Sequence, residues 1–367
     1  MSEARVDGVA ARFTIGVPAH AAEPDLARTL ASLKLSGDRT GCRYEIVVVV
    51  NGPAEATQAV AGVREFASRA GLALTEGGEA RVPEPGRACD PVIGEVDRPG
   101  TSVGAAGGGS ASPTVRLLRL TMLSKVAAWN AIRSAARAPV LVFADADVRV
   151  APSAIGILLS RLADEPGLAA VGSRESAVLE SGDGVVARVA ALPYRFDFSN
   201  VPGRLYALRA TAIVEPMPAQ VVAEDAYLTV KLGRSRFAKE LAAVVYLRPP
   251  LTWRDYLRQR VRNEVGKLQL AREFPDLLRT HGFGRYPWHA LLRGISPREY
   301  PLVVASLAVR LYARIAARNL VEGGFRAGWE VLDSTKSWSP PDGPGLEAGA
   351  GHETWPARAP GGGKASI

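Results

Sequence analysis

Two carboxylates follow directly on an apolar segment in the middle of the chain. Segment 139–148 is a run of apolar residues that ends in Asp145 and Asp147, one residue apart. Residues i and i+2 of a strand project to the same side, and in open α/β sheets ligands bind beyond the carboxyl ends of the strands. Paired carboxylates suit Mg²⁺ or Mn²⁺, which usually also take phosphate oxygens. A polar turn that merely ends the strand is the alternative interpretation of these two residues alone.

Three other segments carry side chains that fit the same chemistry. Lys125 begins a predicted helix, where it can reach a phosphate together with free backbone N–H groups. Glu224 and Asp225 follow a short apolar run, and a carboxylate beside an acceptor hydroxyl can act as a general base. Gln259 and Arg262 share one face of a predicted helix, and the arginine offers a fork for phosphate oxygens. Taken singly, a solvated lysine, a helix cap at Asp225 and an ordinary basic helix are the simpler interpretations.

The elements that must position these residues follow an alternating pattern. Segments 13–17 and 44–50 are apolar and predict strands, whereas 23–35 and 54–70 have helical periodicity. Strand, helix, strand and helix at this spacing predict a doubly wound, mostly parallel sheet flanked by helices. Beyond residue 113 the pattern predicts strands over 115–120, 139–144, 168–171 and 243–247, an extended stretch over 203–208, and helices over 124–138, 153–163 (N-capped by Ser153), 225–232 and most of the chain from Trp253 onward.

Two segments are too rich in Gly, Pro, Ser and Ala to build a core. Segment 76–113 is predicted to be a flexible insertion, because its glycines lack both the P-loop ending and a dinucleotide fingerprint. Segment 339–367 is predicted to be a disordered tail. The sequence therefore divides into a catalytic domain over 12–250, a helical C-terminal region over 251–338 that completes the site, and the tail.

The bulk composition bounds the classes of function. The 367 residues are 47% hydrophobic and carry a net charge of +8, which favours phosphate-bearing partners. Nucleic acid is not expected, because the basic residues form no stripe on a recognisable binding motif. Cys42 and Cys89 show neither a metal-binding spacing nor a disulfide framework, which is typical of a reducing cytoplasm. Neither a signal peptide nor a membrane-spanning segment of about 18 uncharged apolar residues is predicted.

Taken together and in this order, the segments resemble the family 2 glycosyltransferases of the GT-A fold, from Phe13 to about residue 266. Ile15-Gly-Val-Pro-Ala19 is similar to the first strand and nucleotide-side turn of that family. Lys125 to Asn130 is similar to its Gly-Lys-x-x-Ala-Leu-Asn segment, with Ser124 for Gly and Trp129 for Leu. The remaining segments that carry the resemblance are Asp145-Ala-Asp147 for the Asp-x-Asp motif, Gly203 to Arg209 for the acceptor-side segment, Glu224-Asp225 for the Glu-Asp motif, and Gln259 to Arg262 for the Gln-x-x-Arg-Trp motif, with Asn263 in place of Trp.

The resemblance implies an inverting transfer of a sugar from a nucleotide-diphosphate sugar to an acceptor hydroxyl. Asp225 would be the catalytic base, and Asp145 and Asp147 would hold the divalent cation, Mg²⁺ or Mn²⁺. The other implied roles are donor binding by Pro18, Ala19, Asn51, Lys125, Asp145, Gln259 and Arg262, and acceptor-side contacts by Gly203, Arg204 and Glu224. The acceptor itself, whether a glycan, a glycolipid or a small molecule, is left open.

The departures from the family pattern leave alternatives. Asn51-Gly52 stands where many members have a carboxylate, and Asn263 replaces the tryptophan, which argues against a processive polysaccharide synthase. A sugar transferase that acts on a polyprenyl phosphate shares the early motifs. From different classes, a non-catalytic scaffold of the same fold and a basic nucleic-acid-binding module also remain.

An apolar stretch near the C-terminus bears on the location of the protein. Arg310, Arg314 and Arg318 recur every four residues within 301–320, beside a wide apolar helical face. Three arginines make a spanning helix costly. Two interpretations follow: a helix packed on the catalytic domain with its arginines in water, or peripheral attachment of 288–320 to an anionic membrane surface. We therefore expect a cytoplasmic protein, with peripheral location on the inner face of the membrane as the second interpretation.

Overall fold

The structure is a computed structural model, and it describes residues 13–53, 57–80, 112–195, 203–213, 215–275, 295–323 and 335. The predicted tail 339–367, most of the predicted insertion 76–113 and the residues from 288 to 294 lie outside this part of the chain. The helices and strands of the described part are β1 (Phe13–His20), α1 (Leu26–Asp38), β2 (Tyr44–Asn51), α2 (Gln58–Arg69), β3 (Leu74–Glu79), β4 (Thr114–Leu120), α3 (Lys125–Ala135), β5 (Val140–Ala144), β6 (Arg149–Val150), α4 (Ala154–Asp164), β7 (Ala170–Ala177), α5 (Val185–Ala191), β8 (Leu205–Arg209), α6 (Glu224–Leu232), β9 (Phe237–Leu247), α7 (Trp253–Glu273) and α10 (Tyr300–Glu322).

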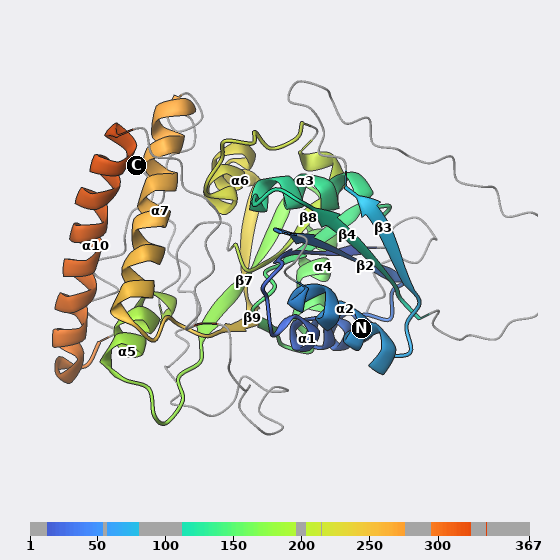
Figure 1. Cartoon of the computed structure of the whole chain (residues 1–367), viewed down its shortest axis with the longest axis horizontal. Helices are drawn as coiled ribbons and strands as arrows, with labels where there is room; N and C mark the ends of the chain where they lie inside the picture. Colours follow the sequence, from blue (N-terminus) through green and yellow to red (C-terminus); the bar gives the residue numbers. More distant parts are fainter. Residues whose placement is uncertain are drawn as a thin grey trace, which may run out of the picture.

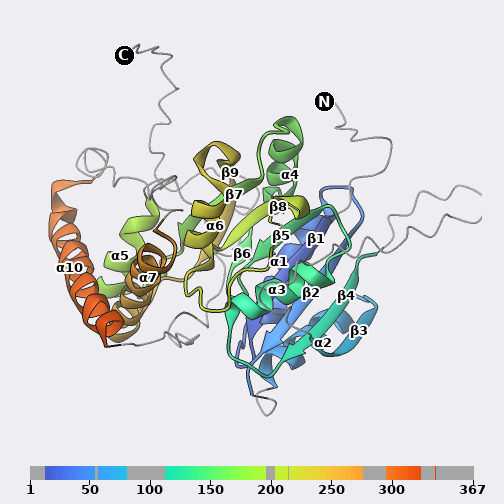
Figure 2. The ribbon, with the colours of Figure 1, turned by 90° about the horizontal axis from the view of Figure 1, so that it is seen from above.

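A single mixed sheet forms the centre of the molecule (Figures 1 and 2). Its strand order is β3-β4-β2-β1-β5-β8-β7-β9-β6. The five strands from β3 to β5 are mutually parallel, whereas β8 runs antiparallel between β5 and β7, and β6 runs antiparallel to β9. Strand β2 reads as a nearly continuous apolar run because both faces of a parallel sheet are covered. The predicted α/β class with a mostly parallel sheet and a helical C-terminal region is confirmed.

Helices cover both faces of the sheet, as a doubly wound fold requires. One core cluster packs α1, α2 and α4 on one face, and a second packs α3 and α6 on the other. The alternation of side chains along each strand divides β2 between them: Ile46, Val48 and Val50 face the first cluster, and Val47 and Val49 face the second. Burial of both faces fixes the register of the central strands, and with it the position of each strand end.

The structure corrects several boundaries of the sequence analysis. The predicted insertion begins later than expected, because residues 76–79 extend β3, which pairs with β4. The glycines there had favoured a loop. Helix α5 was not predicted. Ser153 occupies the N-cap position of α4 but makes no capping hydrogen bond, because its backbone is helical rather than extended. Asp225 is not a helix cap either, since the N-cap residue of α6 is Ala223.

The C-terminal region stands beside the sheet as a layer of helices. Helices α7 and α10 run side by side, and α5 packs against both (Figure 1). A small third cluster joins the three helices through Val189 of α5, Tyr256 of α7 and Val309 of α10. By length and composition, segment Pro297–Glu322 would be able to cross a membrane, which the sequence analysis did not predict.

Candidate active site

The side chains with reactive chemistry meet at one edge of the sheet. The parallel strands β1, β2, β4 and β5 all end there, and Asp145 follows β5 directly. Because β8 is antiparallel to β5, its beginning lies at the same edge, and the Asp145 backbone N–H donates to the carbonyl of Arg204 at 3.0 Å. The topology therefore brings segments 145–147 and 203–204, about sixty residues apart in sequence, into direct contact.

Lys125 links the two acidic segments. Its ammonium lies 2.8 Å from Asp145 Oδ1 and also contacts Glu224 Oε1. Ser124 places it there: this residue caps α3, and its hydroxyl accepts from the backbone N–H of Ala127. Ser124 thus fixes the start of the helix. Lys125 is therefore more than a solvated charge, because it connects the strand-end aspartate with the Glu-Asp pair.

Arg204 lies between the two aspartates. Its Nη1 atom is 3.6 Å from Asp145 Oδ2 and 3.5 Å from Asp147 Oδ1, and its Nε atom is 3.9 Å from Glu175 Oε1. From the sequence, this arginine was expected on the acceptor side, and Glu175 was not among the candidate residues. Strand β7 positions Glu175 at the same edge, but its sequence carries no motif. The position of Glu175 near the site follows only from the strand order of the sheet, in which β7 lies beside β8.

An aromatic stack sets the distance between helix and sheet beneath these charges. The rings of Trp129 on α3 and Phe143 on β5 stack at 4.9 Å, and Phe143 stacks on Tyr206 of β8 at 5.4 Å. The Trp129 indole N–H donates to the Tyr206 hydroxyl at 2.7 Å. Because Lys125 lies one helical turn before Trp129, the stack fixes the face of α3 that carries the lysine. Trp129 therefore has a structural role beneath the charged cluster.

Polar contacts hold the segment that leads into Glu224 and Asp225. Asn130 of α3 donates to the carbonyl of Met217 at 2.8 Å and accepts from its N–H at 2.9 Å. From the other side, Gln269 of α7 accepts from the N–H of Val222 at 3.1 Å. Gly266 of α7 lies so close to Ala223 that a β-carbon there would approach to 2.6 Å. The C-terminal region therefore positions the Glu-Asp pair, through residues that the sequence analysis did not select.

Asp225 is the acidic group that is least neutralised by its neighbours. Glu224 is paired with Lys125, and Glu175 faces Arg204. Among the described residues Asp225 forms no ion pair, and its Oδ1 accepts the backbone N–H of Ala226 at 2.8 Å. Its Oδ2 lies toward Gly203, where a β-carbon would come within 3.3 Å. This arrangement leaves one carboxylate oxygen of Asp225 for proton transfer.

Burial shapes the protonation of the cluster. Burial raises the pKa of Asp225 above the usual aspartate value, whereas the charge of Lys125 and the N–H of Ala226 favour the ionised form. Burial likewise raises the pKa of Glu224 against the opposing charge of Lys125. Burial alone would lower the pKa of Lys125, but Asp145 and Glu224 together raise it, so the lysine stays charged. A raised carboxyl pKa is typical of a group that accepts a proton near neutral pH.

The other predicted donor-binding residues belong to β1, to the end of β2 and to α7. Pro18 and Ala19 have buried side chains in β1, so a ligand could meet little of them except backbone. Asn51 is buried at the end of β2 and donates to the carbonyl of Ser124 at 2.8 Å. This hydrogen bond therefore holds the start of α3 against the end of β2. Gln259 is buried and Arg262 half-buried on α7.

Two carboxylates that face one cationic atom form a donor set that fits a divalent cation. Within the described ranges no group of three His, Cys, Asp or Glu side chains converges to hold a metal by itself. Mg²⁺ is commonly bound through one or two carboxylates plus phosphates of the substrate. Asp145 and Asp147 therefore fit a cation whose coordination is completed by a phosphate-bearing ligand.

Gly203 is expected to be indispensable for the position of Asp225. A β-carbon at Gly203 would lie 3.2 Å from Cβ and 3.3 Å from Oδ2 of Asp225, so the carboxylate must shift in a Gly203→Ala variant. Small misplacements of a reacting group can cost about 10²-fold in rate. We expect turnover to fall at least about tenfold, with the melting temperature nearly unchanged. Gly184→Ala is the matched control because a β-carbon there meets nothing within 4 Å; equal turnover of both variants would contradict the expectation.

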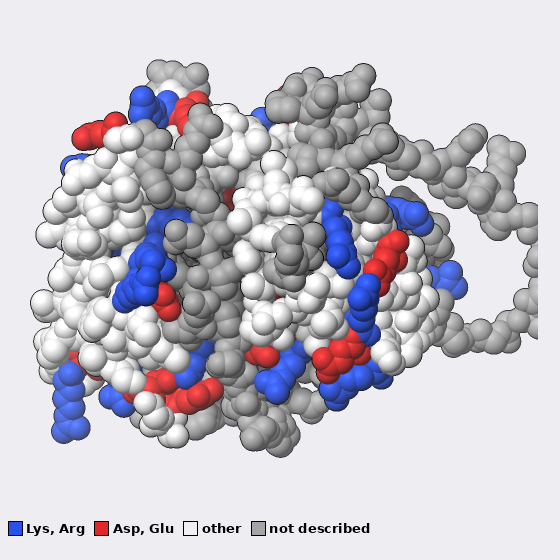
Figure 3. All heavy atoms as spheres, in the orientation of Figure 1, with Lys and Arg blue, Asp and Glu red and all other residues white. Residues whose placement is uncertain are grey.

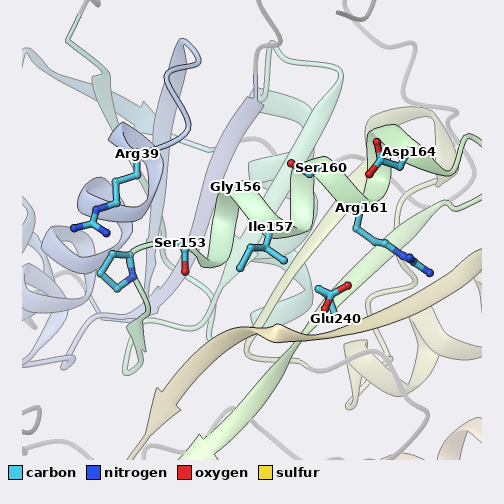
Figure 4. Close-up of a pocket in the computed structure, with 9 residues that line it drawn as sticks. Arg39, Ser153, Gly156, Ile157, Ser160, Arg161, Asp164 and Glu240 are labelled. Atoms are coloured by element: carbon cyan, nitrogen blue, oxygen red, sulfur yellow. The ribbon is translucent and has the colours of Figure 1, made fainter. Parts of the chain in front are cut away.

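A depression in the surface lies apart from this site. It lies between α4, the residue after α1 and β9 (Figure 4). The residues that line it are Arg39, Pro152, Ser153, Gly156, Ile157, Ser160, Arg161, Asp164 and Glu240. None of them belongs to the cluster around Asp145, and Arg161 is already paired with Glu165 at 2.8 Å.

Comparison with known proteins gives loose likenesses. No protein-family model matches the sequence, and no curated protein matches it. Among solved structures, the mannosyltransferase PcManGT from Pyrobaculum calidifontis, in complex with GDP-Man and Mn²⁺, is 17% identical with a TM-score of 0.48, over 88% of this chain and 77% of that one. TarS 1-349 from S. aureus, in complex with UDP-GlcNAc, is 10% identical with a TM-score of 0.41, over 88% and 95%. Likenesses this remote transfer no ligand and no residue role to the chain.

Proposed function

We propose that this chain is an inverting, metal-dependent glycosyltransferase of the GT-A type, which moves a sugar from a nucleotide-diphosphate sugar to an acceptor hydroxyl. One observation carries the proposal. At the carboxyl edge of a parallel sheet, Lys125 joins the strand-end pair Asp145 and Asp147 to the segment that bears Asp225. These contacts support the proposal, because transfer from a diphosphate donor needs positive charge at the diphosphate close to a base.

Each residue of the cluster has a distinct role in the proposed reaction. Asp225 accepts the proton of the acceptor hydroxyl while that oxygen bonds to the anomeric carbon. The bond from this carbon to the diphosphate oxygen breaks, and its electron pair stays with the leaving nucleotide. Lys125 places positive charge at the diphosphate, and Gln259 and Arg262 extend the binding surface. When bound at Asp145 and Asp147, a divalent cation supplies further charge for the leaving group.

Inversion follows from the use of one displacement. A retaining mechanism with a covalent intermediate would need a second free carboxylate, besides the base, to attack the anomeric carbon. Among the described residues of the cluster, Glu224 is engaged by Lys125 and Glu175 faces Arg204. Asp225 remains as the base, and attack from the face opposite the leaving group inverts the configuration.

The same geometry weighs on the alternatives. A polyprenyl-phosphate acceptor would attack through an ionised oxygen and would need no base, so the placement of Asp225 favours a hydroxyl acceptor. A non-catalytic scaffold has no need for the Lys125 contacts to both acidic segments. A nucleic-acid-binding module typically has a continuous basic surface. On the face seen in Figure 3, basic (blue) and acidic (red) side chains are interspersed.

The proposed base predicts a characteristic pH dependence. Because burial raises the pKa of Asp225, the ionised base is lost at a higher pH than for an ordinary aspartate, whose pKa is about 3.9. We expect kcat/KM to fall toward acidic pH, with a midpoint above the ordinary aspartate pKa. Full activity is expected only at pH values above this midpoint. Donor binding by an Asp225→Asn variant, measured over the same range, serves as the control and should lack this acid limb. A midpoint at or below the ordinary value would contradict the assignment.

The test of the proposed function is a transfer assay with a panel of nucleotide-diphosphate sugars, Mn²⁺ and simple hydroxyl acceptors. We expect release of a nucleoside diphosphate that stops with EDTA, and a product of inverted anomeric configuration by NMR. Release of a nucleoside diphosphate with retained configuration would overturn the proposed mechanism. Transfer that is unaffected by EDTA would overturn the role of the metal.

A further inference from the structure

Helix α10 carries an exposed apolar stripe along its outer side. Tyr300, Val304, Leu311 and Ile315 recur at helical spacing, and their exposed fractions are 47%, 65%, 61% and 53%. We call these four residues the outer stripe. In the orientation of Figure 3, the surface over α10 is largely uncharged. Large apolar side chains at this exposure over about four helical turns mark a contact surface rather than scattered surface residues.

The opposite side of α10 is already used for packing. Val309, Ala313 and Ala317 are buried toward α7, which is the neighbour of α10 along its length. Only 28% of the most apolar window of segment Pro297–Glu322 is buried inside the molecule. An apolar helix of the protein core would be mostly buried. The outer stripe therefore faces away from the described protein, and it needs an apolar medium or partner.

The charges of α10 fit an anionic lipid surface. Arg314 and Arg318 are exposed beside the outer stripe, and Glu322, in the last turn, is the only acidic residue of the helix. An apolar face bordered by arginines and tyrosines is typical of a helix that lies in a membrane interface. A second copy of α10 on the same stripe would offer these arginines no matching acidic row, whether the two helices ran parallel or antiparallel. Charge therefore favours lipid over self-association.

The neighbouring helix determines how α10 can meet the membrane. Helix α7 has 21 residues, about 31 Å in length, which is close to the hydrocarbon thickness of a bilayer. Its sequence WRDYLRQRVRNEVGKLQLARE is strongly charged. Because α7 and α10 pack side by side, a spanning α10 would carry these charges into the hydrocarbon, which is costly. An orientation in the membrane plane leaves α7 on the aqueous side.

We infer that α10 contacts a membrane and lies in the plane of an anionic bilayer, with its outer stripe at the boundary between the headgroups and the acyl chains. This inference does not depend on the proposed reaction. Since α7 separates α10 from the catalytic edge, the site would lie on the aqueous side of the surface, within reach of an acceptor presented there.

The test is flotation of the full chain with vesicles of phosphatidylcholine alone or with about one-third phosphatidylglycerol. We expect binding to the anionic vesicles and little to the neutral ones. The variant Leu311→Glu with Ile315→Glu should lose binding at least about tenfold, and so should Arg314→Glu with Arg318→Glu, because each basic residue near the surface contributes about fivefold. Leu35→Glu is the matched control, since Leu35 is 47% exposed on α1. All variants concern exposed side chains, and circular dichroism verifies their folding.

Either of two results would overturn membrane binding by the outer stripe. One is the absence of binding to anionic vesicles at low salt. The other is a stable dimer in solution that Leu311→Glu dissociates, because the outer stripe would then contact a second copy. Nitroxide labels at positions 304, 311 and 315, read by depth-dependent relaxation, distinguish the orientation: equal shallow depths support the in-plane helix, whereas a graded depth across the bilayer contradicts it.

Discussion

Replacing Asp225 with Asn is expected to lower turnover by about 10²–10⁴-fold while leaving donor affinity within about twofold. The amide keeps the shape of the side chain but cannot accept the acceptor proton. Because Asp225 forms no ion pair among the described residues, its loss should leave the contacts of Lys125 with Asp145 and Glu224 unchanged. The measurement is steady-state kinetics together with calorimetric titration of the donor.

Glu224→Gln provides the contrast for this variant. Glu224 contacts Lys125, so its neutralisation should shift the lysine and weaken donor binding as well as turnover. If Asp225→Asn instead loses donor affinity and keeps its rate, Asp225 is a binding residue and the assigned base is wrong.

Replacing Asp147 with Asn is expected to abolish metal-dependent transfer in a protein that remains folded. The variant loses one of the two carboxylates proposed to bind the metal. Loss of a residue that only supports a metal ligand already lowers metal affinity by about 10–100-fold. Binding of Mn²⁺ in the presence of a nucleoside diphosphate, followed by electron paramagnetic resonance, reports the loss without reference to turnover. Near-normal metal affinity in the variant would remove Asp147 from the metal site.

Arg204→Gln is expected to raise the affinity for the metal, whereas Asp147→Asn lowers it. The guanidinium lies 3.6 Å and 3.5 Å from the two aspartates, where its positive charge competes with a cation for the same oxygens. Without nucleotide, the variant is expected to bind Mn²⁺ more tightly than the original protein. Weaker binding would show that Arg204 orients the aspartates rather than competing for them.

The local sequence was sufficient to predict two of the elements that position the candidate site. An apolar run that ends in Asp145 and Asp147 predicts a strand end, and parallel strands carry their ligands at that end. Ser124 before Lys125 predicts a capped helix whose start points to the same edge. These predictions depend on neighbours within a few residues, and the structure confirms the strand and the helix while bringing Lys125 and Asp145 into contact.

The remaining parts depend on contacts between distant segments. The place of β8 between β5 and β7 decides that Arg204 meets both aspartates, and nothing in segment 203–209 specifies that neighbour. Glu175 belongs to a strand without a motif. Gln269 and Gly266 position the segment before Glu224 by packing, which a single sequence does not reveal. Strand β3, which runs into a glycine-rich stretch, was not predicted, because its pairing with β4 outweighed local preference.

Calorimetric titration of nucleotide-diphosphate sugars into the protein, with Mn²⁺ or with EDTA, tests whether the cluster around Lys125 binds a donor together with a divalent cation. We expect saturable binding of at least one such donor with Mn²⁺. We expect this binding to be lost in EDTA and in the variant that carries both Asp145→Asn and Asp147→Asn, and to be retained in Asp225→Asn. Binding that is equally tight in EDTA and in the double variant would contradict the claim, as would the failure of every donor to bind.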